Sequence, residues 1–583
     1  MSTLLKNGLL WTDGEARSFS YVSIKDGWIC NVLFEDNPSF NESSFTNIVD
    51  AKGGLVLPGL HDSHIHVAML GESRYFLNLI DCYSIEDLKE MLRKHLLLYP
   101  DINYIQGVNW DQTKLGRYPN RFDLDDVCAT KPIFLWRACW HIGVGNTKSL
   151  TIGGIDVTAT PQPVSGGVIN CDSDTKLPNG ILKERACELV TVTLNQKSPE
   201  EKIKFIKDGV DLCLSMGLTS VHTNDEKSVN LYKSLRDSHQ LPIRVFLTPN
   251  YNDLSVPCDE GGCLDAPPIH AVSVFDPNKP MNSPDSKLVI ERVKIFADGS
   301  LGAETAAIRT EASAGSYNGV LIHDLDSLVT FNADAKSKNY RVEIHAIGDA
   351  AADVVLKSLE LANISPLERP VLTHCQVLGH DLLEKMKTLN VIANIQPSFV
   401  PTDMKWVSQR LSSSKQQHAY VWKSMLQMGI HVAGGSDAPI ESPSPFLGMF
   451  DAIFRRDRND PNIVFKPEEK LSLAEAISIY THGGAYASGT EHVLGEVKEG
   501  YVADIIIVDP RVLSDHSLLA STKPSIVIVG GDVVYRDSTA APSATVPMQS
   551  NFIPGKNGPF AFLSADSCSS SKFCRCKLVK KCF

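Results

Sequence analysis

The segment Pro58-Gly59-Leu60-His61-Asp62-Ser63-His64-Ile65-His66 decides the fold that this sequence predicts. It follows the apolar residues 55–57, which are typical of a buried β-strand. Positions i and i+2 of an extended segment point to the same side, so His64 and His66 can bind one cation where the strand ends. Such a pair alone is as often structural as metal-binding, and repetition of the pattern is what favours a metal site.

Metal-ligand residue types recur at the ends of later apolar runs. Residues 292–296 contain Lys294, and a lysine in a buried strand is costly unless its charge is removed or paired. The next runs end in His345 and His374, and residues 431–437 end in Asp437. Imidazole nitrogen and carboxylate oxygen together suit zinc, with iron or manganese as the alternatives.

The order of these residues predicts an α/β fold. In a (β/α)8 barrel the carboxyl ends of all strands converge on one face, where the active site lies. Helical patterns such as residues 199–207 alternate with apolar strands, which implies a parallel barrel or a doubly wound sheet. The strands are expected near residues 218–223, 243–248, 292–297, 342–345, 371–374, 391–395 and 431–434.

Five motifs carry a resemblance to a known family. They are the segment at 58–66, Val293-Lys294-Ile295-Phe296-Ala297-Asp298-Gly299-Ser300, Ile344-His345-Ala346-Ile347-Gly348-Asp349, Gly435-Ser436-Asp437-Ala438-Pro439 and Tyr480-Thr481-His482-Gly483-Gly484-Ala485. Over about residues 4–540 the chain resembles the amidohydrolase superfamily, specifically the YtcJ-like amidohydrolase 3 family. The resemblance implies a TIM-like metal-dependent hydrolase barrel with a composite β-sandwich formed by the N- and C-terminal segments.

The predicted domain boundaries follow from turn-punctuated strands at both ends of the chain and from one long gap. Residues 1–57 and 485–545 are expected to form the two parts of the β-sandwich, and residues 58–484 the barrel. About 150 residues separate His66 from the next plausible barrel strand, far more than a βα loop needs, so a subdomain is inserted at about 80–200. Residues 546–583 are expected to be a disordered, basic, cysteine-rich tail.

The resemblance also implies a role for each site residue. His64 and His66 hold a first metal with Asp437, His345 and His374 hold a second, and carboxylated Lys294 bridges the two. Asp437 takes a proton from the attacking water and passes it to the leaving nitrogen, which is general acid–base catalysis. One or two zinc ions per chain are therefore expected.

Three further residues are candidates for substrate binding. Trp110 can form an apolar wall for substrate, although packing in the core of the inserted subdomain is the alternative. His141 can donate to a substrate oxygen. Asp298 orients ligands or substrate, or else caps a turn. The sequence also departs from the family pattern, because Thr373 precedes His374 where relatives usually carry an acidic residue, and Cys139-Trp140-His141 replaces Asp-Gly-His.

Composition agrees with a large soluble enzyme. The 583 residues are 43% hydrophobic and 21% charged, and the net charge of −12 argues against a nucleic-acid partner. Lack of a signal peptide or an apolar run of ~20 residues favours the cytoplasm. Ten of the 14 cysteines are scattered through the first 375 residues without CxxC spacing, as expected for reduced thiols. Membrane contact, at an endomembrane surface, is conceivable only through acylation and positive charge of the tail.

Two functional classes remain. The favoured one is a hydrolase of carbon–nitrogen bonds other than peptide bonds, acting on a small-molecule amide substrate of the N-substituted amide or formamide type. The other is a signalling or scaffold protein, for instance in light signalling, that kept the barrel without its catalysis. Intact ligand positions favour hydrolysis, and Lys294 disfavours a deaminase. Whether the chain forms a homo-oligomer is left open.

Overall fold

The computed structural model describes residues 2–34, 41–79, 81–137, 142–164, 167–184, 186–194, 197–264, 268–269, 286–302, 305–310, 315–405 and 407–537. These residues form two compact units. The first, here the barrel unit, contains Met1–Met69 and the described part of Ile206–Met548. The second, here the inserted unit, contains Leu70–Phe205. Among the described residues, no helix has the length and apolarity that crossing a membrane requires.

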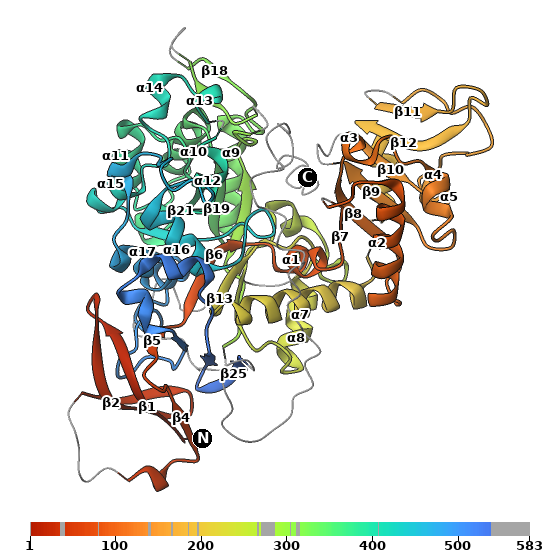
Figure 1. The fold of residues 1–583 in the computed structure, drawn as a ribbon. Coiled ribbons are helices and arrows are strands. Elements are labelled where there is room, and N and C mark those ends of the chain that lie inside the picture. Colours follow the sequence, from red (N-terminus) through yellow and green to blue (C-terminus); the bar gives the residue numbers. More distant parts are fainter. Residues whose placement is uncertain are drawn as a thin grey trace. The chain divides into compact units, whose positions relative to one another are not determined.

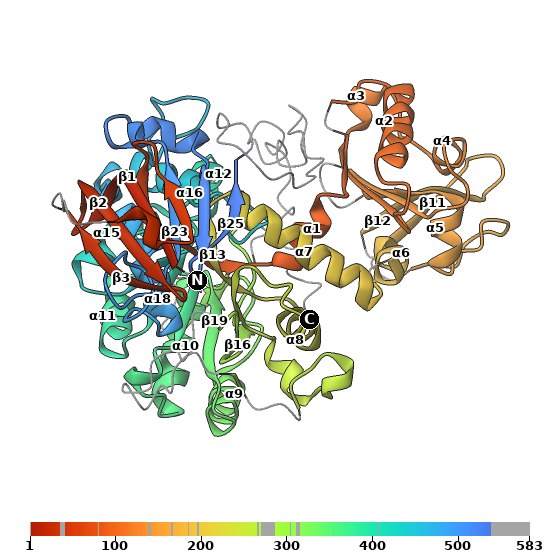
Figure 2. The same ribbon diagram turned by 90° about the horizontal axis from the view of Figure 1, so that it is seen from below.

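The two ends of the chain build one sheet. Its strands are β1 (Ser2–Thr12), β2 (Glu15–Lys25), β3 (Trp28–Leu33), β4 (Asn47–Asp50), β5 (Leu55–Pro58), β23 (Ile505–Val508), β24 (Ile526–Val529) and β25 (Asp532–Arg536). Their order is β25-β24-β23-β5-β1-β2-β3, with β4 paired to β1, and Figure 2 shows the red N-terminal strands beside the blue C-terminal ones. Asp-Gly pairs at 13–14 and 26–27 have positive φ, the conformation of tight hairpin turns.

The sheet joins its two halves where β5 pairs antiparallel with β23, with Pro58 opposite Ile505 and Leu55 opposite Val508. Side chains from both ends share one buried core, in which Leu5 and Phe19 belong to the same cluster as Ile505. The composite β-structure predicted from the sequence is therefore present. Its strands are hydrogen-bonded into a single sheet.

Parallel strands in two arcs make up the centre of the barrel unit (Figure 1). One arc contains β15 (Leu288–Val289), β14 (Arg244–Leu247), β13 (Leu218–Thr223) and β6 (Leu60–Ile65). The other contains β16 (Arg292–Phe296), β19 (Arg341–Ala346), β20 (Val371–His374), β21 (Ile392–Ile395) and β22 (Val432–Gly434). The residues of these nine strands are buried, as expected for strands covered by helices.

The arcs meet at two seams, which gives the strand order of the predicted (β/α)8 barrel. At one seam β15 and β16 follow each other directly, and Asn250 forms a parallel bridge with Lys294. At the other, Asp437 N donates to His64 O at 2.7 Å and His66 N to Ala438 O at 2.9 Å. This second seam brings the end of β6 beside the end of β22.

Helices alternate with the barrel strands. They include α7 (Pro199–Ser215), α8 (Val229–Asp237), α9 (Leu325–Ser337), α10 (Asp349–Leu361), α11 (His380–Thr388), α15 (Trp422–Gln427), α16 (Pro445–Phe454), α17 (Leu473–Tyr480) and α18 (His482–Ser488). Side-chain caps fix where several begin: Asp324 accepts from Ser327 N at the start of α9, and Ser472 forms a capping box with Glu475 at the start of α17.

The inserted unit has its own mixed sheet. Its strands follow the order β11 (Gly167–Cys171), β12 (Pro178–Glu184), β10 (Ile142–Gly145), β9 (Ile133–Arg137), β8 (Ile105–Trp110) and β7 (Leu77–Asn78). Helix α2 (Ile85–Leu98) contributes Leu88 and Leu92 to a buried cluster with Ile105 and Leu135. The insertion predicted at about 80–200 lies within this unit.

Candidate metal centre

His64, His66 and Asp437 come together at the seam between β6 and β22. Asp437 Oδ1 lies 3.2 Å from His66 Nε2 and 3.5 Å from His64 Nε2. One ligand atom from each of the three residues lies within 4.8 Å of the others. Two imidazole nitrogens and a carboxylate oxygen at this spacing are a suitable ligand set for a divalent transition metal.

Asp62 joins the two segments that meet at this seam. Its Oδ1 accepts from His64 N at 3.1 Å and from Ser436 N at 3.0 Å, so one buried carboxylate ties both ligand-bearing segments. Burial raises the pKa of Asp62 to about 7. A side chain at Gly435 would place its Cβ 2.7 Å from His64 N, so only glycine allows the two backbones to approach this closely.

His345 and His374 lie beside this group, on the neighbouring strands β19 and β20. Their ring centroids are 4.4 Å apart, and the His374 ring is 5.5 Å from that of His64. The four histidines predicted as ligands thus occupy one buried region of the barrel unit.

His64 and His66 each have one ring nitrogen fixed by a protein acceptor. His64 Nδ1 lies 3.1 Å from Glu343 Oε1, and His66 Nδ1 lies 2.7 Å from the carbonyl oxygen of Asn224. Because a carbonyl oxygen accepts only, Nδ1 of His66 carries the hydrogen. In both residues Nε2 faces Asp437 Oδ1, the side from which a metal would bind.

His345 and His374 are fixed through opposite ring nitrogens. His345 Nε2 lies 3.0 Å from Gly299 O, whereas His374 Nδ1 lies 2.8 Å from Gln396 Oε1. His345 therefore keeps Nδ1 free and His374 keeps Nε2. Metal-binding histidines almost always donate their second ring N–H in this way, and all four candidates do so.

The protonation states of His64 and Asp437 also suit a cation. Burial lowers the pKa of His64 to about 4, so the ring is neutral near pH 7. Burial would raise the pKa of Asp437, but the hydrogen bond from His66 and the neighbouring imidazoles outweigh it and lower that pKa below its ordinary value. For His66, burial lowers the pKa while the contact with Asp437 raises it, and the net shift is upward.

Lys294 is fully buried in β16 and has a carboxylate partner that the sequence analysis did not identify. Its Nζ lies 3.0 Å from Glu343 Oε1, and the same oxygen accepts from Thr373 Oγ1 at 3.0 Å. Burial raises the pKa of Glu343, but the charge of Lys294 outweighs it and lowers the pKa well below the ordinary value. An acidic residue two positions before His345, within an otherwise apolar run, was the signal that could have revealed it.

The three residues proposed for substrate contact have different outcomes. Asp298 is buried and accepts from Ala307 N, Ile347 N and Gly348 N at 2.8–3.0 Å, as a turn cap does. Its Oδ1 also lies 3.4 Å from His345 Nε2, so orientation of a ligand and capping of a turn both stay predictions. Trp110 is fully buried in the core of the inserted unit and donates to Leu135 O at 2.8 Å, so its position is that of the core alternative. His141 lies outside the described residues.

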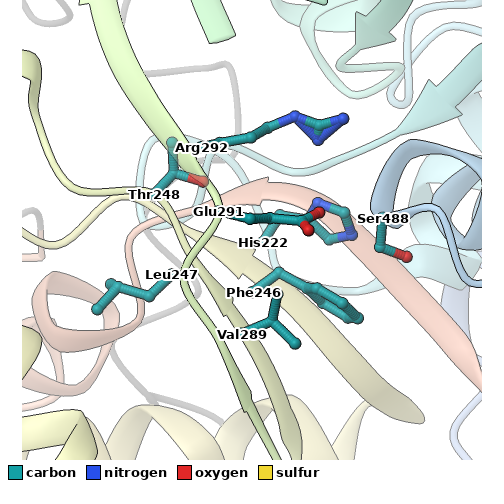
Figure 3. Close-up of a pocket in the computed structure, with 8 residues that line it drawn as sticks. All are labelled: His222, Phe246, Leu247, Thr248, Val289, Glu291, Arg292 and Ser488. Carbon is teal, nitrogen blue, oxygen red and sulfur yellow. The ribbon is translucent and has the colours of Figure 1, made fainter. Parts of the chain in front are cut away.

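A separate cavity lies among the barrel strands and contains none of the predicted ligands. It has a volume of about 10 Å³ and combines apolar and polar side chains (Figure 3). The lining residues are His222, Phe246, Leu247, Thr248, Val289, Glu291, Arg292 and Ser488. The His222 ring packs 4.7 Å from that of Phe246, and burial lowers its pKa well below the ordinary value. This cavity is therefore distinct from the metal centre.

Comparison with known proteins gives the class to which this fold and this group of possible metal ligands belong. Residues 47–535 match the model of the amidohydrolase family, so this chain belongs to that family.

Three curated relatives share most of this chain. The putative amidohydrolase YtcJ of Bacillus subtilis is 29% identical over 92% of this chain and 100% of its own length. Protein LONG AFTER FAR-RED 3 of Arabidopsis thaliana is 27% identical over 91% of both chains. N-substituted formamide deformylase of Arthrobacter pascens is 24% identical over 79% of this chain and 84% of its own.

A solved structure supports the fold. An uncharacterized metal-dependent hydrolase from Pyrococcus furiosus is 28% identical and has a TM-score of 0.71, covering 87% of this chain and 99% of its own.

Proposed function

We propose that this chain is a zinc-dependent hydrolase that cleaves a carbon–nitrogen bond other than a peptide bond in a small-molecule amide of the N-substituted amide or formamide type. The supporting observation is that each of the four histidines has one ring nitrogen within hydrogen-bond distance of a protein acceptor. Nε2 of His64 and Nε2 of His66 face Asp437. The bond type agrees with the name of the deformylase relative.

The residues present fit a divalent metal. His64, His66 and Asp437 would hold one ion, and His345 with His374 a second, through nitrogens that their hydrogen bonds leave free. A bound metal lowers the pKa of water and polarises a substrate carbonyl. Asp437 is ionised, because its pKa is lowered, and can accept the proton of the attacking water before passing it to the leaving nitrogen.

Carboxylation of Lys294, which would bridge the two ions, stays a prediction. It requires Nζ to exchange its ion pair with Glu343 for a carbamate. Dependence of the second metal equivalent on added bicarbonate would test it.

The metal assignment is tested by the double variant His64→Ala/His66→Ala. We expect it to lose bound zinc and amide hydrolysis, because the variant lacks two of the three candidate ligands His64, His66 and Asp437. It should keep a cooperative unfolding transition. Metal content after dialysis and thermal unfolding are measured side by side. His222→Gln, a change at a buried histidine outside the ligand set, is the matched control and should keep its metal. Full zinc occupancy in the double variant would contradict the site.

The relative named LONG AFTER FAR-RED 3 keeps a second function under consideration, a signalling or scaffold role in light signalling. A scaffold does not need the Nε2 atoms of His64 and His66 to face Asp437. Wild-type protein that binds no zinc and turns over none of a panel of N-substituted amides and formamides would favour this role. Cytoplasmic location, oligomeric state and membrane contact of the tail stay predictions, and residues 546–583 lie outside the described part of the chain.

A further inference from the structure

One oxygen atom of Glu343 receives donors from three different barrel strands. His64 Nδ1 on β6 lies 3.1 Å away, Lys294 Nζ on β16 lies 3.0 Å away, and Thr373 Oγ1 on β20 lies 3.0 Å away. All four side chains are buried. Glu343, on β19, thus contacts His64 and Lys294 through the same oxygen atom.

The contact between Glu343 and His64 determines which ring nitrogen is free. A carboxylate accepts the hydrogen of Nδ1, and Nε2 is then the atom with the lone pair. Nε2 is also the atom that lies 3.5 Å from Asp437 Oδ1. Loss of the acceptor would release the ring to rotate or to carry its hydrogen on Nε2, and either change removes a ligand atom from the proposed metal.

A side chain at position 373 is a second one that can reach the Glu343 oxygen beside His64. Thr373 lies opposite His345 in the β19–β20 register, and its hydroxyl already touches the oxygen that His64 uses. The expected acidic residue before His374 is absent, but Glu343 places a carboxylate at this point from the neighbouring strand. A longer acidic side chain at 373 would reach the same region.

We propose that Glu343 is a positioning residue for His64, and that a carboxylate at this point can be supplied from either β19 or β20. The proposal rests on the metal site described under the proposed function. The competing role is a purely structural ion pair, in which Glu343 serves only to neutralise buried Lys294.

The variants separate these roles because they remove different parts of the contact. Glu343→Ala removes the acceptor and the charge. Glu343→Gln keeps an oxygen that can accept from His64 but removes the charge that pairs with Lys294. Glu343→Ala/Thr373→Glu moves the carboxylate to the neighbouring strand. Thr373→Val is the matched control, since it removes one donor to Glu343 and leaves the carboxylate in place.

The readout is binding of Co²⁺ to metal-free full-length protein, followed by its absorption spectrum, with thermal unfolding measured in parallel. We expect Glu343→Ala to weaken binding roughly 10–100-fold and to change the spectrum, as losing an outer-shell partner of a ligand does. Glu343→Gln should bind more tightly than Glu343→Ala, and Thr373→Val should resemble wild type. The double variant should recover the wild-type spectrum.

Two outcomes overturn the proposal. The first is wild-type Co²⁺ binding by a folded Glu343→Ala protein. Where that variant does not fold, the deciding result is a Glu343→Gln protein that is destabilised and no longer binds Co²⁺, because this variant keeps the acceptor and lacks only the charge. The other is a folded double variant without recovery of the spectrum. Failure of wild-type protein itself to bind Co²⁺ would instead contradict the proposed function.

Discussion

At the scale of single residues, His374 is oriented by a chain of amide groups whose direction is fixed at one end. Asn394 Nδ2 donates to Ser63 O at 2.5 Å, and a backbone carbonyl can only accept. Asn394 Oδ1 must then accept from Gln396 Nε2, at 2.7 Å, which leaves Gln396 Oε1 to accept from His374 Nδ1. The chain connects His374 to β6, the strand that contains His64 and ends just before His66.

Gln396→Leu should therefore weaken metal binding at His374 by roughly 10–100-fold, because the ring loses the acceptor that keeps Nε2 free. Metal stoichiometry and affinity, measured by titration of metal-free protein, check this expectation. Gln416→Leu changes a glutamine elsewhere in the barrel unit, where it donates to Leu411 O, and should leave binding unchanged. Equal metal affinity in the two variants would show that the amide chain has no part in the site.

The sequence predicted ligands but not the atoms that hold them. His64, His66, His345, His374 and Asp437 could be chosen as candidate ligands because ligand residue types ended successive apolar runs. Their acceptors at Asn224 and Gly299 are backbone carbonyls, which any residue supplies, so no residue type could indicate them. Which histidine uses which nitrogen likewise depends on packing between strands far apart in the sequence.

At the scale of elements, one ion pair joins the barrel to the terminal sheet. Arg244 begins β14, and its Nε and Nη2 lie 2.6 and 2.9 Å from the carboxylate of Asp504, just before β23. Asp504 also accepts from Gly530 N at 2.7 Å. Burial raises the pKa of Asp504, but the charge and hydrogen bonds of Arg244 outweigh it and lower that pKa below 3.8.

A carboxylate with a depressed pKa stabilises the folded state above its unfolded pKa, and this contribution is lost as the pH falls through the folded pKa. Asp504→Asn should therefore lower the free energy of unfolding at pH 7 by about 3–5 kcal/mol, because Arg244 keeps a buried charge without its partner. The deficit relative to wild type should shrink below pH ~4, as the wild-type carboxylate protonates. Denaturant unfolding at several pH values measures both effects.

Asp509→Asn is the control for this change. Asp509 pairs with the exposed Arg511, and such surface pairs contribute only ~0–1 kcal/mol. An equal effect of the two substitutions would mean that the Arg244–Asp504 pair adds nothing by being buried.

The elements of the barrel were more predictable than those of the insertion. Strands expected at 218–223, 371–374 and 431–434 correspond to β13, β20 and β22, because continuous apolar runs mark strands buried on both faces. The split of one run into β15 and β16 was not foreseen. Nor was the mixed sheet of the inserted unit, in which β7 has only two residues and is too short for any periodic signal.

At the scale of the whole molecule, the inserted unit has the features of a domain. Its sheet and its two buried clusters, around Leu135 and around Phe134, lie entirely within residues 70–205. We expect a fragment of residues 74–198, which excludes α1 (Val67–Ser73) and α7, to fold alone, since domains of this size can build a sufficient core. Circular dichroism during heating should show a cooperative transition, and a gradual loss of signal would contradict the expectation.

The pairing of β5 with β23 has a consequence for synthesis of the chain. β5 ends at Pro58, and its partner begins only at Ile505, so more than four hundred residues are made between the two. At ~5–20 residues per second this takes roughly 20–90 seconds. During that time the β5 edge lacks its partner strand, and a chaperone that shields it on the ribosome would protect the nascent chain from edge-to-edge association. The last strands to be translated thus complete the first part of the protein to leave the ribosome.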